Sequence, residues 1–409
     1  MRISSLLRQL NCGLVFILSF LCIHCAIANP VIAIPSQPQP PTFLPTAPNL
    51  SASSYILLDA NTGKVLAEKN ANTRLPPASL TKLMTLYIVS AAIKSGQLHW
   101  DDKIRISTKA WKTEGSRMFA KVGEEVPVKE LLRGIIIASG NDAAVALAEH
   151  LAGTEEAFTA LMNQQAKQLG MNDSHFTDST GLPHPQHYST AHDLAVLTMA
   201  YIRNFPEDYS FYSEKWFSHN GIKQPNRNRL LWRYQSADGL KTGHTNEAGY
   251  CLVASAKKNN MRLISVVMGE PSDLGRTEDS IRLMTYGFRF FETKKLVSAD
   301  KPIALAHVWA GQKAEVPLGL TQDLYATIPA GQEKKLKTSI NVPTLNAPVI
   351  KGQSYGQIEI KLNNEIIVSE PLIALANSPK GGLWRRSIDA VKSRFQHIFS
   401  RPDEQLNTG

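Results

Sequence analysis

The reactive side chains that stand out in this chain are Ser79 and Lys82, at the start of a long apolar segment. On a helix, positions i and i+3 lie on one face, so the amine can reach the hydroxyl. A neutral amine can accept the serine proton and replace the histidine of a catalytic triad. The helix start adds positive potential where an oxyanion would form. The pair therefore predicts a nucleophile, Ser79, with Lys82 as its base.

The spacing of this pair is not specific by itself, because it recurs at residues 255–258 and 298–301. The first recurrence falls in a predicted hairpin, where positions i and i+3 diverge, and the second falls between domains. Ser79 differs because it follows Pro76-Pro77-Ala78 and opens a predicted helix. For this motif alone, an ordinary N-cap serine is the alternative.

Two further polar strings give Ser79 its context. Ser139-Gly140-Asn141 lies between two helical patterns, and Lys241-Thr242-Gly243 precedes a predicted strand. Taken singly, helix capping explains the first and a surface turn explains the second. Taken together, Ser-x-x-Lys, Ser-x-Asn and Lys-Thr-Gly occur in the order found in penicillin-binding proteins and class A β-lactamases.

Longer strings carry a resemblance to one family. They cover residues 77–82 (Pro-Ala-Ser-Leu-Thr-Lys), 139–144 (Ser-Gly-Asn-Asp-Ala-Ala) and 238–245 (Asp-Gly-Leu-Lys-Thr-Gly-His-Thr). On these strings the chain resembles the low-molecular-mass D-alanyl-D-alanine carboxypeptidases, the penicillin-binding protein 5/6 type of serine peptidase. The resemblance extends over nearly the whole chain after residue 28.

The resemblance implies roles for the first two motifs. Ser79 would attack the carbonyl group between the two terminal D-alanines, with Lys82 as general base. The ordinary lysine pKa of about 10.4 must be depressed for that task, and partial burial beside a cation such as Lys241 would depress it. Ser139 would pass a proton to the leaving amine, and Asn141 would hydrogen-bond the substrate and Lys82.

The third motif is implied to bind substrate. Lys241 would supply positive potential for the substrate carboxylate, and the strand through Thr242, Gly243 and His244 would pair with the peptide backbone. Backbone N–H groups of the nucleophile and of His244 would form an oxyanion hole. Arg276 resembles the family arginine near the carboxylate, the alternative being a surface arginine at a helix start.

The expected activity is removal of the terminal D-alanine from peptidoglycan pentapeptides, with β-lactam antibiotics as acylating inhibitors. A D,D-endopeptidase acting on cross-links is the close alternative, and a non-catalytic wall-binding protein is another. A β-lactamase is disfavoured because no Glu-x-x-Leu-Asn string lies between the second and third motifs.

A removable leader is predicted at residues 1–28. Two arginines precede an apolar stretch at 14–21, and Ala26-Ile27-Ala28 is a cleavage pattern. The stretch is too short for a membrane-spanning anchor, which is the alternative. We therefore expect an exported protein. The resemblance implies a periplasmic location, with peripheral attachment to the inner membrane through the C-terminal segment described below. Loss of the leader lowers the formal charge from +9 to +7.

No metal and no cofactor are expected. Three of the four cysteines leave with the leader, so Cys251 has no partner for an internal disulfide. The histidines lack the spacing of a metal site. His184 and His187 are expected to be solvated loop residues, with a general-acid role as the alternative. Asp193 is expected to serve in a helix cap.

The apolar patterns predict an α+β fold. A hairpin at residues 54–67 and strands at 249–256 and 262–268 suggest an antiparallel sheet, which the resemblance extends to a β-lactamase/transpeptidase-like domain with a helical cluster. Helical patterns cover residues 80–93, 128–138, 141–151, 155–169, 191–203 and 277–291. The expected segments are the leader 1–28, a Pro-rich N-terminal segment 29–50, a catalytic domain 51–298, a small β-rich domain 299–378 and an amphipathic membrane-anchor helix with its tail 379–409.

The C-terminal segment pairs apolar residues at helical spacing with basic ones. Such a helix is too charged to span a bilayer but suits an anionic membrane surface. A helix docked on the protein's own β-rich domain is the alternative. Because the tail accounts for part of the positive charge, no nucleic-acid partner is required. The residues concerned are Leu383, Trp384, Ile388, Val391, Phe395, Ile398 and Phe399, with Arg385, Arg386, Lys392 and Arg394.

Overall fold

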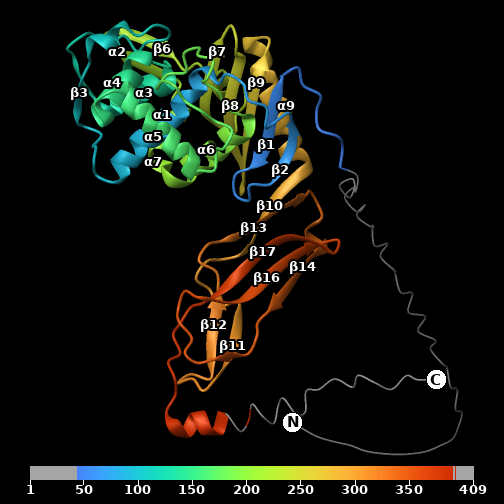
Figure 1. Cartoon of the computed structure of the whole chain (residues 1–409). Helices are drawn as coiled ribbons and strands as arrows, with labels where there is room; N and C mark the ends of the chain where they lie inside the picture. Colours follow the sequence, from blue (N-terminus) through green and yellow to red (C-terminus); the bar gives the residue numbers. More distant parts are fainter. Residues whose placement is uncertain (1–43, 390–391, 393–409) are drawn as a thin grey trace, which may run out of the picture. The chain divides into compact units, whose positions relative to one another are not determined.

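A computed structural model describes residues 44–389 and 392 of the chain (Figure 1). The predicted leader, most of the Pro-rich segment and the end of the tail lie outside the described residues. The described part combines a mixed helix and sheet region with an all-β region that follows it, as the predicted α+β class requires.

The central element is a five-stranded antiparallel sheet with the order β2-β1-β9-β8-β7. Its first hairpin pairs with one strand about 200 residues later: β1 lies beside β9, with Tyr55 opposite Val267. Both predicted hairpins are present. The strands are β1 (Ser54–Asp59), β2 (Val65–Lys69), β7 (Ala237–Thr245), β8 (Gly249–Lys258) and β9 (Met261–Glu270).

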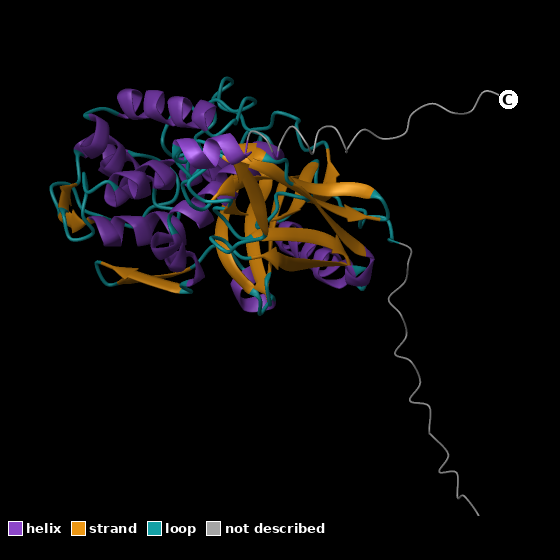
Figure 2. Ribbon diagram, turned by 90° about the horizontal axis from the view of Figure 1, so that it is seen from below, coloured by secondary structure: helices purple, strands orange, loops and turns teal. Residues whose placement is uncertain are grey.

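Helices cover both faces of this sheet. One hydrophobic core lies between the sheet and the cluster that includes α1 and α3, and a second lies between the sheet and α9 (Figures 1 and 2). The longer helices are α1 (Lys82–Lys94), α3 (Val128–Ile137), α4 (Asn141–Ala152), α5 (Glu155–Gln168), α6 (Ala191–Asn204) and α9 (Asp273–Phe290).

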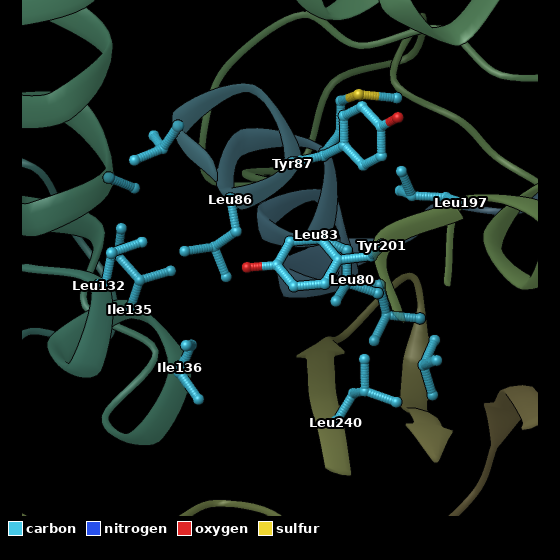
Figure 3. Packing of buried hydrophobic residues seen from close by; sticks show 14 of the residues in the cluster. Leu80, Leu83, Leu86, Tyr87, Leu132, Ile135, Ile136, Leu197, Tyr201 and Leu240 are labelled. Carbon is cyan, nitrogen blue, oxygen red and sulfur yellow. The ribbon is translucent and has the colours of Figure 1, made fainter. Parts of the chain in front are cut away.

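Helix α1 occupies the middle of the first core. It is apolar nearly all round, as a helix enclosed by other elements must be. Figure 3 shows its side chains against those of α3, α6 and β7, and a 3₁₀ turn, η1 (Ala78–Thr81), leads into it. The labelled residues are Leu80, Leu83, Leu86, Tyr87, Leu132, Ile135, Ile136, Leu197, Tyr201 and Leu240. This packing fixes the position of η1, and therefore of Ser79.

Two helix starts differ from the predicted ones. The segment predicted as a helix from residue 80 begins as the 3₁₀ turn η1, and the α-helix starts at Lys82. Helix α9 starts at Asp273 rather than at 277, because the Ser272 side chain accepts a hydrogen bond from the Gly275 N–H and caps it. Arg276 therefore lies within the helix.

Shorter elements connect these parts. They are β3 (Lys103–Arg105), α2 (Thr108–Lys112), β4 (Glu125–Pro127), α7 (Pro206–Tyr209), η2 (Ser210–Ser213), β5 (Trp216–His219), β6 (Ile222–Pro225) and α8 (Leu230–Arg233). Strands β5 and β6 form a hairpin with Trp216 opposite Pro225.

The all-β region has its own core. Its main sheet has the order β14-β16-β17-β12-β11-β15, and β10 pairs separately with β13. Strand pairing in this region thus begins at Phe291, ahead of residue 299. The elements are β10 (Phe291–Val297), β11 (Ala304–Trp309), β12 (Glu315–Gly319), β13 (Leu324–Pro329), η3 (Glu333–Lys335), β14 (Leu336–Asn341), β15 (Leu345–Asn346), β16 (Ser354–Leu362) and β17 (Glu365–Ala374).

Candidate active site

The 3₁₀ turn η1 brings Ser79 and Lys82 together. Lys82 Nζ lies 2.9 Å from Ser79 Oγ and donates a hydrogen bond of 2.7 Å to the carbonyl oxygen of Thr180. The loop that carries Thr180 packs directly on the turn. A Cβ at Gly181, where φ is +88°, would lie 1.8 Å from the carbonyl oxygen of Ala78. The side chain that must accept a proton is therefore held from two sides.

Lys82 is completely buried. Burial lowers its pKa to about 7, although Asp178 and Asp142 oppose this by favouring the charged ammonium. The neutral amine is therefore well populated near neutral pH. The expected depression is present, but it comes from complete burial, and the charge of Lys241 is not among its causes.

A lysine of the third motif and a serine of the second form a second hydrogen-bonded pair, similar to that of Lys82 and Ser79. Lys241 Nζ donates to Ser139 Oγ and to the carbonyl oxygen of Thr242, both at 2.9 Å. Ser139 adopts φ +60° in the link between α3 and α4, which turns its hydroxyl toward β7. Burial, followed by the charges of Lys82, Arg276 and Arg227, lowers the pKa of Lys241 well below its usual range.

Asn141 has a different hydrogen-bond partner from the one expected. Its Nδ2 donates to the carbonyl oxygen of Glu114, while its buried Oδ1 has no partner among the described residues. The reason is the close approach of the loop at Gly115, where a Cβ would lie 2.7 Å from Asn141 Nδ2. The expected bond between Asn141 and Lys82 is not present.

Asp142, next to Asn141, holds the backbone of residues 118–120 in place. Its carboxylate accepts backbone N–H bonds from Met118, Phe119 and Ala120 at 2.9, 3.0 and 3.2 Å. The residue is buried at the start of α4, where a negative charge also suits the helix dipole. The sequence pattern marked Asp142 only as part of a matching string, and its role depends on a loop more than 20 residues earlier.

Arg276 packs against the backbone of β7 and β8. Its guanidinium donates to the carbonyl oxygens of Gly243 at 2.8 Å and Cys251 at 3.2 Å, and it forms an ion pair with Asp273. The residue is 7% exposed, so the alternative of a surface arginine at a helix start is wrong.

An open cavity of about 690 Å³ joins these parts. Ser79 and Ser139 lie on it together with Thr242, Gly243 and His244 of β7 and with Arg276. The His244 ring lies on Tyr250, with their centroids 4.0 Å apart. Other lining residues were not predicted: Ser116, Trp216, Pro225, Asn226, Arg227, Arg229, Trp232, Tyr250 and Asp273.

One loop histidine is not solvated. His187 is 3% exposed, its Nε2 lies 2.8 Å from Thr81 Oγ1, and its Nδ1 lies 3.3 Å from the Asp178 carboxylate. The expectation of a solvated ring was wrong for His187, because the loop folds back onto η1. His184 is exposed, as expected.

Asp178 organises the same loop. Its carboxylate accepts from the backbone N–H groups of Thr180 at 2.7 Å and Gly181 at 2.6 Å. Although burial opposes ionisation, His187 and these amides hold the pKa of Asp178 well below its usual range. Asp193 serves in a cap as predicted, because its N–H donates to Thr190 Oγ1 at the start of α6.

Comparison with known proteins identifies the family. The model of the D-alanyl-D-alanine carboxypeptidase family matches residues 42–272, and that of the penicillin-binding protein 5 C-terminal domain matches residues 291–380. The chain belongs to the D-alanyl-D-alanine carboxypeptidase family.

Individual relatives agree with this assignment. The D-alanyl-D-alanine carboxypeptidase DacA of Escherichia coli (strain K12) is 46% identical over 367 residues, which cover 88% of this chain and 91% of that protein. The crystal structure of penicillin-binding protein 5 from Haemophilus influenzae has 43% identity and a TM-score of 0.79, covering 82% of this chain and all of that one. Penicillin-binding protein D2 of Listeria monocytogenes in its ampicillin-bound form has 34% identity and a TM-score of 0.52, covering 59% of this chain and all of that one. The predicted serine-type D-Ala-D-Ala carboxypeptidase activity is confirmed.

Proposed function

We propose that this cavity cleaves the D-Ala-D-Ala end of peptidoglycan stem peptides through an acyl-enzyme on Ser79. The observation that carries the proposal is the 2.9 Å contact between Ser79 Oγ and the Nζ of a completely buried lysine. A neutral amine at that distance accepts the serine proton as the oxygen attacks the carbonyl carbon of the penultimate D-alanine.

The proton balance uses both lysine–serine pairs. Attack forms the ester on Ser79, breaks the amide bond and sends the proton through Ser139 to the departing amine, which leaves as D-alanine. Water then attacks the ester carbonyl, the bond to Ser79 Oγ breaks, the shortened peptide leaves with a new terminal carboxylate, and a proton from the water restores the serine hydroxyl. Ser139 suits this transfer because its hydroxyl already accepts a hydrogen bond from Lys241 Nζ at 2.9 Å.

We assign substrate binding to Arg276 and to β7, because the lowered pKa of Lys241 weakens the positive charge expected of that residue. We assign the terminal carboxylate to the end of the cavity with Thr242 and Arg276, above the buried Lys241. Thr242, Gly243 and His244 would pair with the peptide backbone, and the N–H groups of the nucleophile and of His244 would bind the oxyanion. Asn141 Oδ1, which lacks a partner among the described residues, would accept a substrate N–H.

The scarcity of acidic side chains among the residues that line the cavity favours a peptidase over a β-lactamase. Of the described residues that line it, Asp273 is the one acid, and it pairs with Arg229 and Arg276. A glutamate that activates water for rapid release of a penicilloyl ester has no counterpart in this lining set. β-Lactams should therefore acylate Ser79, and the resulting ester should be hydrolysed slowly.

We also propose export to the periplasm and peripheral attachment to the inner membrane. The segments 1–28 and 379–409 support this; the first lies wholly, and the second mostly, outside the described residues. Leu383, Trp384 and Ile388 are 77%, 85% and 51% exposed at the start of the tail helix. No helix among residues 44–389 is both long and apolar enough to cross a membrane.

The proposal is tested by product release. Purified protein given a pentapeptide donor should release one D-alanine per peptide, and Ser79→Ala should release none. Purified cross-linked dimers test the endopeptidase alternative, and a chromogenic cephalosporin tests the β-lactamase alternative. Release of no D-alanine by the unaltered protein would contradict the proposal.

A further inference from the structure

Two tryptophans lie at the edge of the catalytic cavity. Trp216 on β5 and Trp232 on α8 line the same cavity as Ser79, and they are 49% and 43% exposed. Their ring centroids are 6.2 Å apart with the planes at 81°. Exposed tryptophans are costly to leave in water, and when paired beside a cavity they offer a large rigid apolar contact.

The position of this pair relative to the substrate follows from a chain of ion pairs. Asp273 pairs with Arg276 and, at 3.0 Å, with Arg229, which immediately precedes the helix that carries Trp232. Under the proposed function, Arg276 lies at the end of the cavity that takes the terminal carboxylate. Because that carboxylate belongs to the residue that leaves, the tryptophans lie on the leaving-group side.

The charges around the rings are positive. Lys223 Nζ lies 4.9 Å from the Trp216 ring centroid, and Lys215 Nζ lies 5.9 Å from that of Trp232. Asp273 is neutralised by its two arginines, and Glu214 is paired with Arg133 at 2.7 Å. A ligand that lies over these rings must therefore be apolar along its length and is favoured by a negative end.

We propose that Trp216 and Trp232, with Lys215 and Lys223, form a subsite for leaving groups larger than D-alanine. The ligand class is a D-configured amino acid with a long side chain that ends in a carboxylate, the kind of amine that a diamino dicarboxylic acid supplies in a cross-link when it is the last residue of its stem peptide. This inference rests on the proposed function and extends it to D,D-endopeptidase activity. The amide bond at the carbonyl carbon of the penultimate D-alanine breaks, as with the smaller leaving group. The acyl group passes to Ser79, and the larger amine leaves with the proton.

The test uses donors that share one acyl-D-Ala half and differ in the final D-residue: D-alanine, D-norleucine, D-2-aminoadipate and D-lysine. Each kcat/KM is divided by the value for the D-alanine donor measured on the same protein. We expect the ratio for aminoadipate to exceed that for norleucine, and norleucine to exceed lysine, because the rings contact the methylene groups and the lysines attract the carboxylate.

Variants separate the two contributions. Trp216→Ala should lower the norleucine and aminoadipate ratios together, by about tenfold. Lys223→Gln should remove only the advantage of aminoadipate over norleucine. Trp111→Ala is the matched control, since Trp111 is 41% exposed on α2 and does not line the cavity. A melting curve for each variant checks its fold.

The outcomes distinguish this inference from the proposed function. If the unaltered protein cleaves the D-alanine donor and the ratios for the longer residues do not respond to Trp216→Ala, the subsite is wrong and the carboxypeptidase stands. A preference for D-lysine over D-2-aminoadipate would also overturn the subsite. If no donor is cleaved, the proposed function fails, and the subsite fails with it.

Discussion

Lys82 Nζ lies 2.7 Å from the carbonyl oxygen of Thr180, a residue almost 100 positions later in the chain. The proposed general base is thus held by the loop that Asp178 and His187 organise, as well as by its own helix. The base and this loop therefore form one unit, and the first predictions concern it.

The rate of acylation should depend on pH through Lys82. Because the neutral amine is the base and the pKa is about 7, acylation by penicillin should be lost below pH 7 and reach a plateau above it. The measurement is the second-order acylation rate constant as a function of pH. A rate that does not change between pH 5 and 9 would contradict the assignment of Lys82.

Asp178→Asn should move that acid limb to lower pH. The Asp178 carboxylate raises the pKa of Lys82, so its neutralisation lets the amine lose its proton more readily. Asp173→Asn is the matched control, because Asp173 lies in the same region but pairs with Arg74 at the surface. A shift to higher pH, or an equal shift in both variants, would refute the electrostatic coupling.

Gly181→Ala should slow acylation, whereas Gly170→Ala should not. Both glycines have positive φ, so the backbone conformation alone costs each variant about 1 kcal/mol of stability, and the clash at Gly181 adds to that cost. Only at Gly181 would the added Cβ lie 1.8 Å from the Ala78 carbonyl oxygen; at Gly170 nothing lies within 4 Å. Penicillin acylation kinetics and urea unfolding measure the two effects. Equal acylation rates in the two variants would show that the loop does not position η1.

Asp142→Ala should lower the free energy of unfolding by about 3 kcal/mol, since three backbone N–H groups lose a shared buried acceptor. Asp101→Ala is the control, because Asp101 is exposed. Denaturant unfolding of both variants gives the comparison. A loss as small as that of the control would mean that the 118–120 segment does not depend on this carboxylate.

The Ser79–Lys82 pair could be predicted from sequence because its motif is local, whereas the contact between Lys241 and Ser139 joins distant residues and was not predicted. Ser79 and Lys82 share one turn, and the order of the three motifs specified which strings to combine. The antiparallel sheet followed from apolar runs separated by turn residues, and both hairpins are present.

The surroundings of these pairs could not be predicted in the same way. His187 lies in a polar loop, and it is buried only because Gly181 lets that loop pack against η1. Asn141 was expected to bond Lys82, but the approach of the Gly115 loop decides its partner. The sequence pattern around Trp216 and Trp232 does not distinguish them from core residues. The two rings meet only in the folded protein, where β5 and α8 border one cavity.

The most direct test of the account is the location of the penicillin adduct. Purified protein labelled with fluorescent penicillin at neutral pH is digested, and the modified peptide is sequenced by mass spectrometry. The account predicts one adduct, on Ser79, and none in Ser79→Ala, although that variant keeps the melting curve of the unaltered protein. An adduct on another residue, or undiminished labelling of Ser79→Ala, would contradict it.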